Sequence, residues 1–332
     1  MKILKTVKKV PGGLMVVPLL LGAAVNTFFG TSILGLTEGG VWTWFSGTFT
    51  THLWQSGAMP ILAVFLFCNG ATIDFKRAGV PLVKGVTLTA VKVGIGIIAG
   101  LLVNALVGPA GILGLTPLAI VASLSNSNGG LYASLAGEYG DATDVGAVAI
   151  LSINDGPFFT MVALGASGIA NIPINPRIGC VVPIVIGCIL GNLDEDIREF
   201  CVPGASMMIP FFAFPLGAGL NLKNLIVGGA PGILLGVACT LITGLCGYAV
   251  YKAFGHVSAF GIEKPEVGGA IGTTAGNAAA TPMAVAAADA SLLAISEAAT
   301  AQVTCAIIVT AILCPLLVTW LHGIEEKKRV HA

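Results

Sequence analysis

The sequence has few charged residues. Only 10% of its 332 residues are Asp, Glu, Lys or Arg, whereas a soluble domain carries about 25%. The chain therefore has little room for a soluble domain. Its formal net charge is zero and its basic residues form no patch, so nucleic acid is not expected as a partner.

The sequence also lacks metal-binding and disulfide patterns. Its eight cysteines show no Cys-x-x-Cys spacing, and most lie in apolar runs, where cysteine acts as a small buried hydrophobic residue. We therefore expect neither a disulfide nor a cysteine metal site, and no cofactor.

The chain is rich in apolar residues. Hydrophobic residues make up 55% of it, and its mean hydropathy is +0.94. Because a helix needs about 20 apolar residues to cross a bilayer, the sequence predicts an all-α polytopic membrane protein with ten transmembrane helices. The expected spans are 12–36, 56–73, 80–107, 115–137, 145–168, 179–192, 203–221, 226–253, 267–287 and 298–321.

The flanking residues add detail to this topology. Segment 37–55 carries Trp42, Trp44 and Trp54, which predict an interfacial helix or aromatic belt. With both termini cytoplasmic, thirteen Lys or Arg fall inside and only Arg177 and Lys223 outside. The positive-inside rule favours this orientation. The first run is long enough to be a span, so a removable signal peptide is not expected.

Two spans are interrupted by polar residues. Residues 123–130 contain two Asn, three Ser and a Gly pair, and residues 272–282 combine Gly, Thr and Asn277 with Pro282. Such residues weaken or break helices. Two breaks in corresponding halves are typical of a transporter binding site. The alternative is tight helix packing through small residues.

The two halves of the chain show weak internal similarity. Matching pairs in the same order are Val17-Pro18 with Val182-Pro183, Pro60 with Pro210, and Asn126 with Asn277, the last pair 151 residues apart. Each half has an odd number of spans, five. We therefore expect a first repeat over 1–168 and an inverted second repeat over 169–332.

Asp155 is expected near the middle of the fifth span, beside Asn154 and Pro157. A carboxylate at this depth costs about 2.5–3.5 kcal/mol on insertion scales and marks function by default. It could bind a cation or carry a proton. The alternative is a structural pair with Lys92, the other charge at membrane depth. Lys92 would either attract a substrate carboxylate or offset Asp155.

Two other classes of protein receive little support. Gly165-Ala166-Ser167-Gly168 matches a serine-protease pattern and suggests an intramembrane hydrolase, but all four histidines fall in loops or at span ends. A channel would need rings of repeated polar residues, which the sequence does not indicate. The acidic loop that contains Glu138, Asp141 and Asp144 is interpreted as solvated surface.

Several stretches occur in a characteristic order along nearly the whole chain. They are Lys9-Val10-Pro11-Gly12-Gly13-Leu14-Met15, Pro60-Ile61-Leu62-Ala63-Val64, Cys68-Asn69-Gly70-Ala71, Asn128-Gly129-Gly130-Leu131-Tyr132-Ala133-Ser134, Gly191-Asn192-Leu193-Asp194 and Pro210-Phe211-Phe212-Ala213-Phe214. Together they resemble the bacterial 2-keto-3-deoxygluconate permease family. The resemblance implies inner-membrane uptake of that sugar acid by proton or sodium symport, and no enzymatic activity. Sodium-coupled uptake of another small organic or sugar acid is the alternative.

The resemblance also implies the fold of the bile-acid sodium symporters, with two inverted repeats, a panel and a core, and crossing broken spans four and nine. The expected substrate-binding residues are Asn69, Thr72, Lys92, Asn126, Asn128, Gly129, Thr273 and Asn277. The expected cation-binding or coupling residues are Ser125, Asn126, Ser152, Asn154, Asp155 and Thr281. A sodium ion, if sodium is the coupling ion, is expected at Asn126, Asn154 and Asp155. The acidic residue expected in span nine is absent.

Overall fold

The computed structural model describes residues 2–9, 13–33, 39–74, 79–108, 111–155, 157–219, 222–257 and 260–331. These residues form helices and, apart from one isolated bridge between Ile112 and Leu115, no β-structure. The all-α prediction is therefore confirmed.

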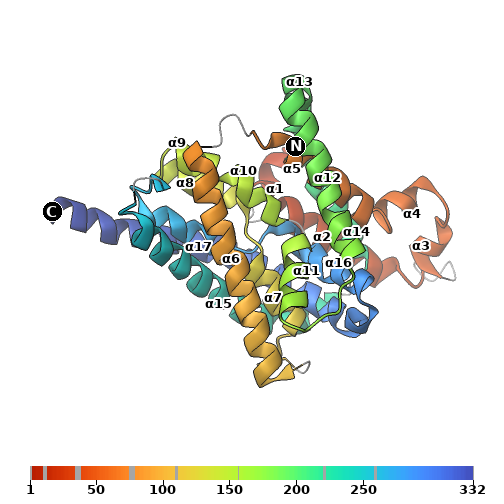
Figure 1. Ribbon diagram of the computed structural model, residues 1–332. Helices are drawn as coiled ribbons and strands as arrows, with labels where there is room; N and C mark the ends of the chain where they lie inside the picture. The colour runs from red at the N-terminus through yellow and green to blue at the C-terminus, as the bar shows by residue number, and fades with distance from the viewer. Residues whose placement is uncertain are drawn as a thin grey trace.

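The first half of the chain contains eleven α-helices and one described 3-10 helix. They are α1 (Ile3–Val7), α2 (Gly13–Phe29), α3 (Gly40–Trp44), α4 (Phe49–Trp54), α5 (Ala58–Thr72), α6 (Gly79–Leu106), α7 (Pro117–Ser125), α8 (Gly129–Tyr139), α9 (Ala142–Gly146), α10 (Val148–Leu151), η3 (Ser152–Asp155) and α11 (Pro157–Ala166). The short helices α3 and α4 lie in the Trp-containing segment. Figure 1 shows them at the side of the molecule opposite to the C-terminus.

The second half is built from longer helices and from 3-10 segments. They are α12 (Ile174–Leu193), α13 (Glu195–Cys201), α14 (Gly204–Ala218), α15 (Leu222–Phe254), η5 (Pro265–Ile271), η6 (Gly276–Ala280), α16 (Thr281–Ala288), η7 (Ala290–Leu292) and α17 (Leu293–His331).

Three of the described helices are long and apolar enough to cross a membrane. They are Gly79–Leu106, Gly228–Phe254 and Ala290–Val330. The pair Glu195–Cys201 and Ser206–Ala218, bent by 44°, makes a fourth if it is one span. Four further apolar helices have 10–17 residues. The full count of ten spans stays a prediction.

The helices pack in two groups. In the first, which we call the four-helix group, α14 packs against α2 and α5, and α5 packs against α12. In the second, the broken-helix group, α15 packs along α17 and η5, and α6 packs against α7 and α11. Figure 1 shows α15, α17 and α6 toward one side and α2, α5, α12 and α14 toward the other.

Glycines bring the backbones of the four-helix group into contact. A Cβ on Gly22 of α2 would overlap the carbonyl oxygen of Phe214 in α14, and one on Gly217 would overlap that of Leu19. A Cβ on Gly187 of α12 would likewise overlap the Phe67 carbonyl oxygen in α5. These helix pairs therefore interlock at positions that only glycine fits.

The acidic loop differs from its prediction. Asp144 is buried, and its Oδ1 lies 2.7 Å from Nζ of the buried Lys84 in α6. The prediction that this carboxylate is solvated is wrong, because Asp141 caps α9 by accepting the Asp144 N–H, and α9 packs against α6. Burial raises the pKa of Asp144, and the Lys84 ammonium opposes that shift. Asp141 remains partly exposed.

Candidate functional site

The first helix break lies between α7 and α8. Helix α7 ends at Ser125, and Asn126 is extended with φ −106° and ψ 148°. Helix α8 begins at Gly129, where the Oδ1 atom of Asn128 accepts the N–H of Leu131 at 3.0 Å. An Asn cap satisfies one of the N–H groups that a helix start leaves free. Asn128 therefore has a structural role at the position where substrate contact is predicted.

The second break lies between η5 and α16. Regular structure stops after Ile271, and it resumes as the 3-10 helix η6, which contains Asn277. Helix α16 follows from Thr281, with Pro282 in its first turn, where the missing N–H is tolerated. Residues 272–280 separate η5 from α16, a longer stretch than residues 126–128, which separate α7 from α8.

The two breaks touch each other. The backbone N–H of Asn128 donates to Oγ1 of Thr273 at 2.9 Å. Oγ1 of Thr274 lies 3.5 Å from the carbonyl oxygen of Ser123, which it can donate to. Ser123, Thr273 and Thr274 are buried, and Asn128 is half-buried. Backbone groups that leave a helix in hydrocarbon need internal partners, and here each break supplies partners for the other.

Lys92, in the middle of α6, reaches the second break. Its side chain is fully buried. Its Nζ donates to the carbonyl oxygens of Thr273 at 2.7 Å and Ile271 at 3.0 Å, and to Thr243 Oγ1 at 2.9 Å. The Sγ atom of Cys239 lies 3.4 Å away. The ammonium is therefore surrounded by backbone carbonyls and neutral side chains from α15 and the second break.

A second polar cluster supports the first break from α11. Thr160 of α11 approaches Oγ of Ser125 at 2.8 Å and accepts from Nδ2 of Asn126 at 3.0 Å. From η3, Nδ2 of Asn154 is 3.4 Å from Oγ of Ser127. The structure thus brings Ser125, Asn126 and Asn154 together around the first break, and their role in cation binding stays a prediction.

Several buried polar atoms near the two breaks have no hydrogen-bond partner among the described residues. They are the acceptors Asn126 Oδ1 and Asn154 Oδ1, the donor Asn277 Nδ2, and Ser123 Oγ. An unpaired buried polar group costs about 1–3 kcal/mol, so such atoms mark places where an ion, water or substrate can bind. The predicted metal positions Asn126 and Asn154 thus have free oxygens.

The other predicted site residues lie in different surroundings. Gly129 is buried at the start of α8, and Thr281 is buried at the start of α16. Asn69 and Thr72 lie in α5, where Asn69 Nδ2 donates to the Phe65 carbonyl and Thr72 Oγ1 to the Asn69 carbonyl. Both side chains are thus hydrogen-bonded within their own helix.

Ser152 and Asp155 lie in η3, one turn before α11. Their side chains fall outside the part of the chain that the structure describes. The predicted roles of both residues stay predictions.

Sequence reasoning missed Thr160, Thr243 and Cys239. Their chemistry is unremarkable in an apolar chain, but one signal was present. Thr243 follows Lys92 by 151 residues, the spacing that separates Asn126 from Asn277. A search for polar pairs at that spacing would have found Thr243.

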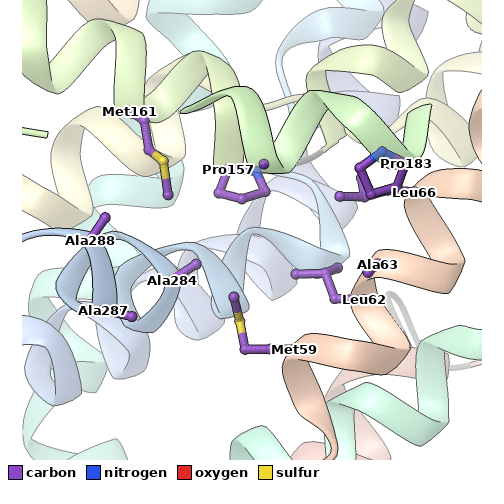
Figure 2. Close-up of a pocket in the computed structure, with 11 residues that line it drawn as sticks. Met59, Leu62, Ala63, Leu66, Pro157, Met161, Pro183, Ala284, Ala287 and Ala288 are labelled. Atoms are coloured by element: carbon purple, nitrogen blue, oxygen red, sulfur yellow. The ribbon is translucent and has the colours of Figure 1, made fainter. Parts of the chain in front are cut away.

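A cavity of about 240 Å³ lies between α5 and α12 on one side and α11 and α16 on the other. Figure 2 shows Met59, Leu62 and Leu66 from α5 opposite Pro157 and Met161 of α11 and the alanines of α16. Its lining is apolar. Helix α11 therefore faces the cavity with Pro157 and Met161 and faces the first break with Thr160.

The Ser167 motif has a structural explanation. The Ser167 hydroxyl is buried and donates to the Leu164 carbonyl at 3.1 Å, one turn earlier in the same region of chain. The Asn104 amide donates to the Ser167 carbonyl at 3.0 Å. Among the described residues, no group of three or more His, Cys, Asp or Glu side chains could hold a metal ion.

Apolar helices that enclose two touching helix breaks define a multi-pass membrane transport protein. The sequence comparisons identify the family. The model of the 2-keto-3-deoxygluconate permease family matches residues 4–327, and the chain belongs to this family. Its members are permeases and not enzymes, which confirms the expected absence of enzymatic activity.

Named relatives are similar over nearly their full length. The chain is 49% identical to "2-keto-3-deoxygluconate permease 1" of Salmonella typhimurium over 96% of this chain and 95% of the relative. It is 41% identical to the 2-keto-3-deoxygluconate permease of Bacillus subtilis, over 99% and 96% respectively. The permease of Xanthomonas oryzae pv. oryzae is 38% identical, over 99% and 100%.

Proposed function

We propose that this chain imports 2-keto-3-deoxygluconate across the bacterial inner membrane together with one cation, by alternating access around the crossing of its two broken spans. The observation that carries the proposal is the 2.9 Å hydrogen bond from the Asn128 N–H to Thr273 Oγ1, with unpaired buried polar atoms around it. Family membership supports the substrate, because the relatives are named for it.

Contacts within the crossing support an inverted repeat. Lys92 bonds to Thr243, and Ser123 to Thr274, and each pair is separated by 151 residues. That separation equals the one between Asn126 and Asn277. Residues related by a two-fold axis can touch each other only near that axis. Two equivalent pairs in contact therefore favour a pseudo-two-fold axis through the crossing, with 1–168 and 169–332 as the repeats.

The two helix groups suit the roles of panel and core. The four-helix group combines α2 and α5 with α12 and α14, so each repeat contributes its first two long helices. The broken-helix group holds both breaks. In the predicted orientation, with both termini cytoplasmic, Met59 at the start of α5 and Ala288 at the end of α16 lie toward the outside. The cavity between the groups would then open outward.

The free polar atoms divide between ion and substrate. Asn126 Oδ1 and Asn154 Oδ1 are acceptors next to the η3 turn that carries Asp155. Sodium binds to oxygen atoms, and a transported proton also needs an oxygen that can accept it. We therefore assign the cation to the first break. Asn277 Nδ2 is a donor and suits a substrate carboxylate or hydroxyl. The apolar cavity walls offer no such contacts.

The stoichiometry follows from charge. The substrate carries one negative charge, so one cation makes the cycle electrically neutral. A second cation would add about 2.3 kcal/mol per 100 mV of membrane potential. One proton or one sodium ion at Asp155, Asn154 and Asn126 is the assignment we favour.

Transport by the purified protein in proteoliposomes tests this function. Labelled 2-keto-3-deoxygluconate is offered under an imposed proton gradient, a sodium gradient or neither, with the membrane potential clamped. We expect saturable uptake driven by one of the two gradients and unaffected by an inside-negative potential. Absence of uptake under every gradient would reject the function, and acceleration by the potential would reject the neutral cycle. Competition with other sugar acids tests the alternative substrate.

A further inference from the structure

The surroundings of the Lys92 ammonium resemble those of a bound ion. Nζ is fully buried and lies within 3.0 Å of three oxygens, the carbonyls of Ile271 and Thr273 and the hydroxyl of Thr243. Unwound backbone carbonyls at a helix break are the groups that coordinate monovalent cations in transporters with broken helices. Here those carbonyls are occupied by a side chain of the protein itself.

Hydrogen bonding alone does not explain why a charged residue, Lys92, occupies this position. A buried charge is costly in a membrane, and neutral donors such as Ser or Gln could also bond to a carbonyl. Thr273 is bonded to Lys92 by its carbonyl and to Asn128 by its hydroxyl. The residue that binds the ammonium is therefore also the residue that joins the two breaks.

We propose that Lys92 is a tethered cation, which permanently fills a monovalent-cation site formed by the Ile271 and Thr273 carbonyls and the Thr243 hydroxyl. The second break then needs no ion from solution, and the free cation binds only near the first break. The consequence for coupling rests on the proposed function, whereas the existence of the cation site does not.

Truncation of the side chain should empty this site. In purified Lys92→Ala, sodium or methylammonium should raise the thermal unfolding midpoint as its concentration increases, because a ligand that binds only the folded state stabilises it. The large cation N-methylglucamine should have no such effect. In the wild-type protein the site is filled, so methylammonium should leave the midpoint unchanged.

Two double variants locate the binding. Lys92→Ala with Thr243→Val loses one of the three oxygens and should lose most of the cation response. Lys92→Ala with Thr240→Val is the matched control, because Thr240 lies in the same helix, is buried, and has a hydroxyl without a partner among the described residues. It should keep the response. A response that Thr240→Val removes and Thr243→Val spares would overturn the assignment.

Lys92→Gln separates charge from hydrogen bonding. Its amide can donate to the carbonyls and fills the space, but it is neutral. We expect it to fold, to show no methylammonium response, and to lose substrate uptake that Lys92→Ala regains with methylammonium or sodium. Uptake by Lys92→Gln at the wild-type rate would overturn the proposal. If Lys92→Ala unfolds in every salt, the Gln variant alone decides.

The thermal and transport measurements fail in different ways. If the wild-type chain moves no 2-keto-3-deoxygluconate, the proposed function is rejected, and the cation titration of Lys92→Ala still tests the site. If the wild-type chain transports and folded Lys92→Ala responds to no small cation, the tethered-cation proposal is rejected and the transport function stands.

Discussion

The two helix breaks are stabilised by different groups. At the first break, neutral side chains form the hydrogen bonds: Asn128 caps α8, and Thr160 bonds to Ser125 and Asn126. At the second, the charged Lys92 binds backbone carbonyls directly. The first break retains free acceptor oxygens, whereas the second retains a free donor on Asn277.

This difference suggests how cation binding and substrate binding are separated between the two breaks in the proposed cycle. In the proposed inverted repeat, Lys92 and Thr243 occupy corresponding positions, and the two side chains meet at 2.9 Å. A fixed charge on one side of the crossing satisfies the carbonyls there. The unpaired amide oxygens of Asn126 and Asn154 lie on the other side. In the proposed cycle, the cation binds beside the first break and the substrate beside the second.

The largest expected effect comes from Asp155, on the cation side. Asp155→Asn should abolish concentrative uptake while retaining some substrate exchange, because a neutral side chain mimics the cation-loaded state. Uphill uptake and counterflow in proteoliposomes measure the two activities. Glu138→Gln, which changes an exposed carboxylate, is the control. Wild-type accumulation by Asp155→Asn would show that the cation side does not depend on this carboxylate.

Removal of the two amides should separate the breaks further. Asn128→Ala and Asn277→Ala should each weaken substrate binding by about 1–3 kcal/mol if a buried partner is left unpaired. Only Asn128→Ala should also lose helix-cap stability, about 0.5–2 kcal/mol. Substrate titration and thermal unfolding of the purified variants measure both quantities. Unchanged affinity in both variants would reject the substrate assignment, and equal losses of stability would remove the distinction between the breaks.

A smaller effect is expected from hydroxyl groups that support each break. Thr160→Val should cost about 0.5–1.5 kcal/mol of stability, the net contribution of a typical hydrogen bond, and also change the cation dependence of uptake, since Asn126 loses a partner. Thr310→Val removes the acceptor of the Thr274 N–H and should cost stability alone. Thr304→Val is the control, because its hydroxyl bonds only within α17. A change of cation dependence in Thr310→Val would contradict the division proposed here.

The smallest effect is expected at the end of α16, beyond the second break. The hydrogen bond from the Ser291 hydroxyl, together with backbone N–H groups of Ser291 and Asn171, lowers the pKa of Asp289. A carboxylate whose pKa is lower in the folded state stabilises the fold at every pH above its unfolded-state pKa. This stabilisation is lost as the pH falls through the folded-state pKa. The difference in unfolding midpoint between wild type and Asp289→Asn should therefore shrink in acid. A constant difference would contradict this.

Local sequence carries much of the fold and only part of the site. The all-helical class follows from apolar runs, and the polar segments 123–130 and 272–282 coincide with the interruptions of the helices, because Asn, Gly and Pro act on their own backbone. Asn128 illustrates the limit. Asn fits both a substrate contact and a helix N-cap, and the structure shows the cap.

Contacts between residues far apart in the chain could not be predicted from the sequence. Lys84 and Asp144 both suggested positions near water, but α9 packs against α6 and buries them together. The carbonyls bound by Lys92 belong to residues 179 and 181 positions away. Every residue has a backbone carbonyl, so the pattern of residue types does not show which carbonyls bind Lys92.

The interlocking glycines constrain how the molecule can change shape. At Gly22, Gly187 and Gly217 the backbones are in contact, so no free space remains between the helices of the pairs α2–α14 and α5–α12. Relative sliding inside either pair would drive backbone atoms into one another. In the proposed cycle each pair therefore moves as a rigid body, and the relative motion takes place between the two helix groups. The apolar walls of the cavity form part of that slip plane, where side chains can exchange neighbours without breaking hydrogen bonds.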